Sequence, residues 1–373
     1  MIYLDSAATS LQKPESVYKA VLHAMRFMAS PGRGGHRASM LAADTVFKCR
    51  SELAELFHVD DLEKVVFTQN ATHALNIAIH SIVNKGDNVV VSGYEHNAVT
   101  RPLHAIGANI RIAESTLFDE EAAVMSFAEK LSGASCAICT HASNVFGFIL
   151  PIERIAKLCR DKGVHLIVDA SQSAGSVMLD FVSLGAKFVA MAGHKGLFGP
   201  QGTGVLICSN TAKPLIAGGT GSDSISSDMP DYLPDRLEAG THNVPGIAGL
   251  LEGVRYVRRR GLDTIMNHER KMMAITADRL MDISRIKLFR ARNPELQSGV
   301  LSVTIDGVDC DVLAEELGRH DIAVRAGLHC APAAHKTAGT VDTGTVRLSV
   351  SPFSKESEVL RAVSVMGRIV KKM

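Results

Sequence analysis

Short apolar runs without polar alternation, separated by segments long enough for a helix, most constrain the fold of this chain. A strand with apolar residues on both sides must be buried on both faces, and helix-length connections join parallel neighbours. The pattern predicts an α/β fold with a mostly parallel central sheet, in which ligands bind beyond the carboxyl ends of the strands. The runs are Val65–Thr68, Asn88–Ser92, Ala137–Thr140, Val164–Val168, Phe188–Ala192 and Gly204–Ile207.

The segments before and after the apolar runs predict other elements of secondary structure. Amphipathic patterns predict helices over 14–28 and 40–57, and a segment rich in Gly, Ser, Asp and Pro over 218–240 predicts an irregular loop or hairpin. The C-terminal part is predicted to contain a long basic helical stretch over 253–281, strands near 300–304, 323–325 and 345–350, a helix over 309–318, and a final helix.

A chain of 373 residues is long enough for two domains with a substantial core. We predict an N-terminal arm over 1–13 that packs near the small domain, and a large domain over 14–250 that carries the parallel sheet. A smaller C-terminal α+β domain would follow over 251–373.

The composition excludes several classes of protein. A content of 46% apolar and 21% charged residues is typical of a soluble globular enzyme, and a net charge of +1 gives no reason to expect nucleic acid or a membrane as a partner. The chain shows neither a secretory signal nor a membrane-spanning apolar run, so we expect a cytoplasmic protein. Its seven cysteines are an odd number, which argues against a disulfide framework. Cys136 and Cys139 would point to opposite faces of a strand and are expected to be inert.

Lys195 lies where a lysine is costly. It follows the apolar stretch 186–192 and opens a glycine-rich turn that ends near Pro200. Such a segment should bury the amine, and burial lowers the pKa of a lysine and makes it nucleophilic. The strand Val164–Val168 ends on Asp169, which suits a pyridinium nitrogen, although a structural role for this carboxylate is the alternative. The two residues together suggest a lysine that forms a Schiff base with pyridoxal phosphate (PLP).

Other polar residues follow the neighbouring strands. The backbone N–H groups of Ala71 and Thr72 begin a predicted helix and suit a phosphate, although an ordinary helix cap explains the same residues. His96 follows the next strand, where its ring can stack on a flat cofactor; a surface or capping role is the alternative. Asn144 and Gln172 are candidates for hydrogen bonds to a phenolic oxygen of the cofactor.

The order of these residues resembles the class V branch of fold-type-I PLP enzymes, and within it the cysteine desulfurase and selenocysteine lyase family. One matching stretch alone is weak support, whereas eight in the same order along nearly the whole chain are strong support. The stretches are Tyr3–Ala8, Glu95–His96, Ser143–Gly147, Val168–Gln172, Gly193–Lys195, Ala239–Asn243, Arg325–Cys330 and Val346–Ser349.

The resemblance implies a role for each candidate residue. Lys195 would carry the cofactor covalently, His96 would stack on its ring, and Asp169 would pair with the pyridine nitrogen. Gln172 and Asn144 would lie on the phenolate side, and Asn144 would also contact the substrate. The residues implied to hold the phosphate are Ala71, Thr72, His194 and, from the other subunit of a homodimer, Thr241.

The chain departs from the family pattern at Ala192, where many relatives have a serine that donates to the phosphate. Losing one hydrogen bond to a charged group would weaken the phosphate contact by roughly 1.5–3 kcal/mol unless water substitutes. The other matching stretches are unaffected by this departure.

Cys330 lies in a polar segment between a glycine and a proline, which predicts a loop position. Neighbouring His329 and Arg325 would lower the pKa of its thiol; a half-buried, inert cysteine is the alternative. The resemblance assigns Cys330 the attack on the substrate sulfur and Arg347 the bidentate binding of the substrate carboxylate. Only 17 positions separate these two residues, so the loop is short. It resembles relatives that keep the cysteine near the cofactor and need a partner to collect the sulfur.

These implications predict a PLP-dependent cysteine desulfurase that converts L-cysteine to L-alanine, with a persulfide on Cys330 that passes to an acceptor protein. The freed Lys195 would move the α-proton, and His96 would donate or accept a proton at the substrate thiol. The main alternative is a selenocysteine lyase acting on L-selenocysteine, because selenium leaves with less help. A class V aminotransferase leaves Cys330 unexplained, and a non-catalytic PLP-bound scaffold for sulfur-trafficking partners is the remaining interpretation.

Overall fold

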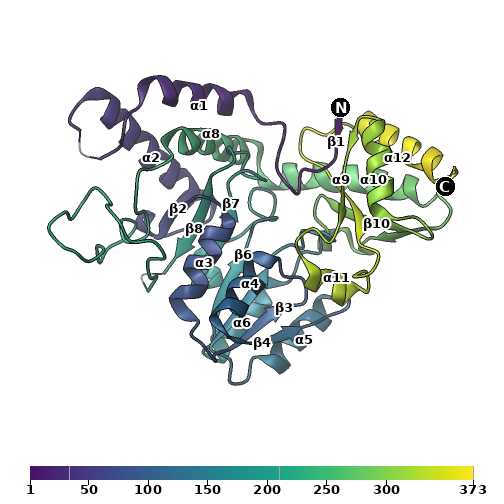
Figure 1. Cartoon of the computed structure of the whole chain (residues 1–373), viewed down its shortest axis with the longest axis horizontal. Coiled ribbons are helices and arrows are strands. Elements are labelled where there is room, and N and C mark those ends of the chain that lie inside the picture. The colour runs from purple at the N-terminus through teal and green to yellow at the C-terminus, as the bar shows by residue number, and fades with distance from the viewer. Residues whose placement is uncertain (33, 210, 373) are drawn as a thin grey trace.

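The computed structural model describes residues 1–32, 34–209 and 211–372. Within these ranges the largest sheet has seven strands, in the order β2-β8-β7-β6-β5-β3-β4 (Figure 1). Pairing is parallel from β4 through β3, β5 and β6 to β7, and β8 is antiparallel to both of its neighbours, so the predicted mostly parallel sheet is confirmed. The strands are β2 (Val65–Thr68), β3 (Asn88–Ser92), β4 (Asn109–Ala113), β5 (Cys136–Thr140), β6 (His165–Asp169), β7 (Phe188–Ala192) and β8 (Gly204–Cys208).

Helices cover both faces of this sheet and form two hydrophobic cores. Cys139 belongs to one core and Cys136 to the other, so the two thiols point to opposite faces as predicted. On one face lie α3 (Ala71–Ile82) and α4 (Asn97–Ile106). On the other face lie α2 (Arg37–Leu56), α5 (Glu120–Lys130), α6 (Ile152–Asp161), α7 (Phe181–Leu184) and α8 (Val244–Arg260). Helix α1 (Glu15–Phe27) packs on α8, and the short 3-10 helix η1 (Leu62–Lys64) precedes β2.

The C-terminal part is built on a second, antiparallel sheet with the order β12-β13-β10-β9 and its own hydrophobic core. The N-terminal strand β1 (Ile2–Tyr3) pairs in parallel with β11 (Ile322–Ala323), so the start of the chain lies against this part. The other elements are β9 (Ile286–Phe289), β10 (Val300–Ile305), β12 (Arg325–Gly327), β13 (Thr345–Ser349), α9 (Leu262–Leu280), α10 (Cys310–Arg319), α11 (Pro332–Ala338), α12 (Glu356–Val370) and the 3-10 helix η2 (Pro294–Leu296).

The predicted helical stretch over 253–281 is interrupted once. The segment holds the end of α8 and the whole of α9, which are separated by Gly261 at a φ of +82°. Helix α8 crosses the predicted domain boundary at 250, and its residues Val254 and Val257 belong to a core of the large sheet. The division into domains stays a prediction.

The segment 218–240 contains no helix or strand among its described residues, as predicted. Strand β4 was not predicted, because it lies at the edge of the sheet and its sequence alternates polar Asn109 and Arg111 with apolar residues. No helix in the described ranges combines the length and the hydropathy needed to cross a membrane.

Candidate active site

The candidate residues of the large sheet meet at one edge. Asn70, His96, Asn144 and Lys195 each follow the end of a strand, namely β2, β3, β5 and β7, and Asp169 is the last residue of β6. Strand β2 is antiparallel to β8, which is antiparallel to β7, so β2 runs in the same direction as the parallel strands. All five residues therefore lie at the carboxyl edge, where open α/β sheets bind ligands.

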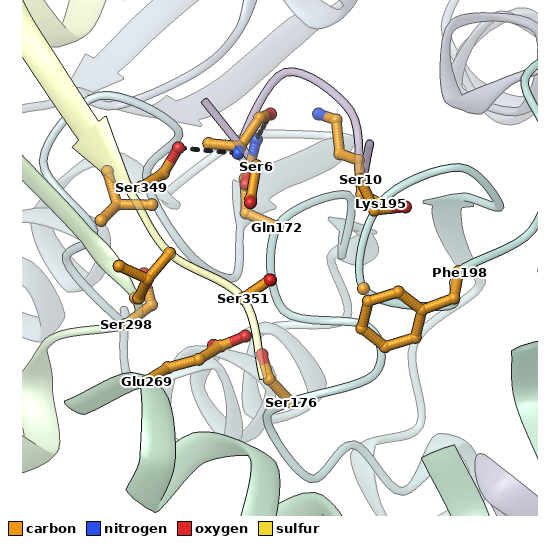
Figure 2. A pocket seen from close by; sticks show the side chains of 15 residues that line it. Ser6, Ser10, Gln172, Ser176, Lys195, Phe198, Glu269, Ser298, Ser349 and Ser351 are labelled. Carbon is orange, nitrogen blue, oxygen red and sulfur yellow. Dashed lines mark hydrogen bonds between the residues drawn. The ribbon is translucent and has the colours of Figure 1, made fainter. Parts of the chain in front are cut away.

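Lys195 lines a cavity of about 40 Å³ together with Ser10 and Gln172 (Figure 2). Desolvation lowers the pKa of Lys195 to about 8; the Asp169 carboxylate opposes this shift, and the Arg347 guanidinium adds to it. At this pKa roughly a tenth of the amine is neutral at pH 7, which is far more than for a lysine in water. The neutral amine is the nucleophilic form of a lysine, and a nucleophilic role for Lys195 stays a prediction.

Asp169 is buried, and its two oxygens differ in their partners. Oδ1 accepts hydrogen bonds from the backbone N of Ser171 at 2.9 Å and from its Oγ at 2.5 Å. Oδ2 has no hydrogen-bond or ion-pair partner among the described residues. The carboxylate is therefore held in a fixed orientation with one oxygen available for a cationic nitrogen.

His96 caps α4 by accepting a hydrogen bond from the backbone N of Ala98 at 3.0 Å through Nδ1. The capping role considered as an alternative is thus present in the structure. Desolvation lowers the pKa of His96, so the neutral ring is favoured. With Nδ1 accepting, the proton of that ring lies on Nε2, which leaves Nε2 as a hydrogen-bond donor.

Helix α3 begins at Ala71, and Asn70 caps it by accepting a hydrogen bond from the backbone N of His73 at 2.9 Å. The ordinary cap considered as an alternative is present here too. It does not exclude an anion, because the backbone N–H groups of Ala71 and Thr72 have no acceptor in the described part of the chain. Free N–H groups in the first turn of a helix favour a phosphate.

Beside this turn lies a cavity of about 620 Å³, whose wall includes Asn70, His194 and Thr241. His194 shares a hydrogen bond of 3.0 Å with Thr9 through Nδ1, and desolvation lowers its pKa to about 4, so the ring is neutral. Thr241 lines the cavity of its own chain. A contribution of Thr241 to a second subunit stays a prediction.

A buried ion pair holds the segment before Thr241, and sequence reasoning missed it. Both terminal nitrogens of Arg50 donate to Glu238, at 3.0 and 2.9 Å, and the same carboxylate accepts from the backbone N of Phe67 at 2.6 Å. His242 lies 2.7 Å from Glu238. An arginine on the buried face of the predicted helix over 40–57 was the available signal, since such a charge needs a partner.

Cys330 is exposed and lies directly before α11, in agreement with the predicted loop position. The backbone of this loop is tied to the sheet edge: the backbone N of Asn97 donates to the Cys330 carbonyl at 2.8 Å, and the Asn144 side chain donates to the His329 carbonyl at 2.8 Å. His329 and Cys330 have φ angles of +49° and +56°, which non-glycine residues rarely adopt. The backbone of Cys330 therefore lies beside the residues that follow β3 and β5.

The predicted effect of His329 on the thiol is wrong. Its buried ring lies 3.0 Å from the Thr345 hydroxyl, and desolvation lowers the pKa of His329 to about 2, so it carries no positive charge. Arg325 pairs with Asp5 at 3.2 Å. A histidine next to a cysteine in sequence lends it charge only if the ring is solvated enough to be protonated.

Arg347 is buried and brought together with Asn144. Its Nη1 donates to the Asn144 backbone carbonyl at 2.8 Å, its Nη2 donates to Asp5 at 2.9 Å, and its Nε has no partner among the described residues. Gln172 donates through Nε2 to the carbonyl of Ala7 at 2.9 Å. Asp5 is a further residue that sequence reasoning missed, although it lies in the matching stretch 3–8.

Comparisons with known proteins agree with this geometry. The model of the aminotransferase class-V family matches residues 2–361. A probable cysteine desulfurase of Pyrococcus abyssi is 32% identical over 388 aligned residues, which cover 100% of this chain and 95% of the relative. A probable cysteine desulfurase of Methanothermobacter thermautotrophicus is 31% identical, with 96% of this chain and 92% of the relative covered.

Solved structures give the same result. The apo structure of a cysteine desulfurase from Thermococcus onnurineus NA1 has a TM-score of 0.92 at 32% identity, covering 100% of this chain and 95% of that one. The Escherichia coli cysteine desulfurase CsdA has a TM-score of 0.87 at 25% identity, with the same shares covered. The chain therefore belongs to the aminotransferase class-V family and has the fold of its cysteine desulfurases.

Proposed function

We propose that the protein is a PLP-dependent cysteine desulfurase that converts L-cysteine to L-alanine and leaves the sulfur as a persulfide on Cys330. One observation carries this proposal: the loop of the exposed Cys330 is hydrogen-bonded to Asn97 and Asn144, at the same sheet edge as Lys195. The relatives named above are cysteine desulfurases, which favours this activity over that of a selenocysteine lyase.

The residues present fit PLP. An amine whose pKa is lowered to about 8 suits attachment to an aldehyde, and the partnerless Oδ2 of buried Asp169 suits a pyridinium nitrogen. Ala71 and Thr72 begin the helix whose cap residue, Asn70, lines a cavity of about 620 Å³, and their N–H groups suit a phosphate. Lys195 would hold the cofactor through its amine; His194 and Thr241 would complete the phosphate site.

When bound, PLP supplies an acceptor for the electrons released at the α-carbon of the substrate. Lys195 would take the α-proton on Nζ, since its lowered pKa increases the neutral fraction of the amine. Asp169 would keep a negative charge beside the pyridine nitrogen. His96 would stack on the ring, and its Nε2 is the nitrogen available to the substrate thiol, because Nδ1 is engaged in the helix cap.

Gln172 and Asn144 would lie on the phenolate side. Each has a side-chain N–H group already committed, that of Gln172 to Ala7 and that of Asn144 to His329, so each is held in place by the protein. A side-chain amide carries a second N–H that remains available to a ligand.

Arg347 would bind the substrate carboxylate, and the Cys330 thiolate would attack the substrate sulfur. In this step a sulfur–sulfur bond forms while the carbon–sulfur bond breaks, and the electron pair of the broken bond stays with the carbon. Protonation at that carbon and return of the α-proton from Nζ of Lys195 then yield alanine, and the persulfide remains on Cys330. Guanidinium and thiolate suit these two tasks.

The persulfide would pass to an acceptor protein. The 16 residues between Cys330 and Arg347 include α11, and the carbonyls of His329 and Cys330 are tied to the sheet edge, so the reach of the thiol is limited. We place the enzyme in the cytoplasm as a homodimer. Turnover without an acceptor that equals turnover with one would argue against the need for a partner.

The proposal is tested by measuring alanine formed from L-cysteine and from L-selenocysteine. We expect Cys330→Ser to lose activity on L-cysteine while it keeps the absorbance of bound PLP. Cys310→Ser is the matched control, because Cys310 begins α10 outside the site and is half-buried. Alanine formation by Cys330→Ser at the wild-type rate would overturn the role of Cys330, and activity on L-selenocysteine alone would favour the lyase.

A further inference from the structure

The N-terminal segment 5–10 passes along the candidate site and contacts several of its residues. The Ala7 carbonyl accepts from Gln172 at 2.9 Å, and the Thr9 hydroxyl lies 3.0 Å from Nδ1 of His194. Figure 2 shows other side chains of the segment on the wall of the Lys195 cavity. The start of the chain is therefore a part of this site rather than a free end.

Within this segment, Asp5 lies between two arginines. Its Oδ1 accepts from Nη2 of Arg347 at 2.9 Å, and its Oδ2 accepts from Nε of Arg325 at 3.2 Å. The two arginines are directly opposite each other on β13 and β12. One carboxylate against two guanidinium groups leaves a positive charge at this place, which suits the carboxylate of an amino acid as a further anion.

Asp5 is one of two supports of the Arg347 guanidinium. The other is the Asn144 backbone carbonyl, which accepts from Nη1 at 2.8 Å. Acceptors at two nitrogens of a planar group determine the orientation of its plane, and the buried charge has no other anionic partner in the described part of the chain. Without Asp5 this charge would be uncompensated and the plane less well fixed.

The backbone around Asp5 is fixed on both sides. The backbone N of Leu4 donates to the Ala323 carbonyl at 2.8 Å, and the backbone N of Ser349 donates to the Leu4 carbonyl at 2.8 Å. The backbone N of Ala7 donates to the Ser349 hydroxyl at 2.9 Å. The backbone that carries the Asp5 carboxylate is therefore fixed beside Arg347.

We propose that Asp5 is a positioning residue for substrate recognition: it holds the Arg347 guanidinium in the orientation that binds the substrate carboxylate, and it stays in place when the substrate binds. This inference rests on the proposed function, in which Arg347 binds that carboxylate. The alternative is that Asp5 occupies the place of the substrate carboxylate and must be displaced. The two views predict opposite changes in the KM for L-cysteine when Asp5 is replaced.

The test measures steady-state kinetics of the PLP-loaded enzyme with Asp5→Asn. We expect the KM for L-cysteine to rise roughly ten- to a hundredfold, the effect of losing one hydrogen bond between charged groups, while kcat and the PLP absorbance stay near those of the wild type. Binding of cysteamine, which lacks the carboxylate, should be unchanged. Asp321→Asn is the matched control, because Asp321 pairs with the amino group of Met1 at 2.6 Å and also ties down the start of the chain.

Each other outcome has a defined meaning. A KM that falls in Asp5→Asn would show displacement and overturn the inference, and so would an unchanged KM or an equal loss of cysteamine binding. If Asp5→Asn loses its fold or its PLP, Asp5→Glu keeps the charge and should restore both with an intermediate KM; failure of both variants would make Asp5 structural. Arg347→Lys separates the proposed function from the inference about Asp5. An unchanged KM in Arg347→Lys would remove the proposed role of Arg347. A raised KM in Arg347→Lys, together with an unchanged KM in Asp5→Asn, would overturn only the inference about Asp5.

Discussion

Replacing Gly175 by alanine tests whether the turn after β6 fixes the position of Lys195. An added Cβ at Gly175 would lie 2.2 Å from the Gly196 carbonyl oxygen, which is about 0.8 Å closer than the 3.0 Å below which real Cβ atoms essentially never approach. The reverse approach is just as close, since a Cβ at Gly196 would lie 2.4 Å from the Ala174 carbonyl oxygen. Because the obstacle is backbone next to Lys195, the turn that carries the amine must move by about that amount.

We expect Gly175→Ala to lower kcat/KM on the order of a hundredfold, the usual effect of displacing a reacting group by about 1 Å. The φ of +98° at Gly175 adds a conformational penalty for alanine. Gly163→Ala controls for that penalty, because Gly163 has a φ of +67° and nothing within 4 Å of an added Cβ; it should lose about 1–2 kcal/mol of stability with normal kinetics. The assays are alanine formation and urea unfolding. Wild-type kcat/KM in Gly175→Ala, with a stability loss equal to that of Gly163→Ala, would refute the reasoning.

Further predictions concern pH, stability and the cysteine loop. Desolvation lowers the pKa of Lys195 to about 8. The rate at which cofactor-free protein binds PLP, followed by absorbance, should therefore rise with pH and level off above about 8. A rate independent of pH would contradict this role of the Lys195 amine. Arg50 and other groups hold the pKa of buried Glu238 below its usual range, so this carboxylate stabilises the fold at neutral pH and its contribution is lost as the pH falls. Glu238→Gln should lower the free energy of unfolding in urea by roughly 3–5 kcal/mol and weaken that dependence on acid pH. Exposed Glu121→Gln should change neither the stability nor its pH dependence. Asn144→Ala removes the bond to the loop carbonyl, so the Cys330 thiol should be alkylated faster than in the wild type, and an unchanged rate would show that the loop is held by other contacts.

The central sheet was predictable because its signal is local. Each buried strand is a short apolar run, and the rule that ligands bind at the carboxyl edge then gathers Lys195, Asp169 and His96 without any knowledge of contacts. The edge strand β4 was missed because one side of it is polar.

The supports of the site were not predictable in this way, because they join distant parts of the chain. Asp5 and Arg347 are 342 positions apart, and Arg50 and Glu238 are 188 positions apart. No spacing rule connects such pairs. His329 shows the opposite error: a neighbour in the sequence was credited with a charge that burial removes.

The two supports of Arg347 differ in how evolution can change them. The one from residue 144 is a backbone carbonyl, which every amino acid provides, so a substitution there alters the hold on the cysteine loop and leaves this contact with the arginine intact. The one from Asp5 is a side chain and disappears with a single codon change. A substitution at residue 144 would therefore keep this contact with Arg347 and lose the side-chain amide proposed to face the cofactor, whereas the proposed role of residue 5 requires an acid at that position.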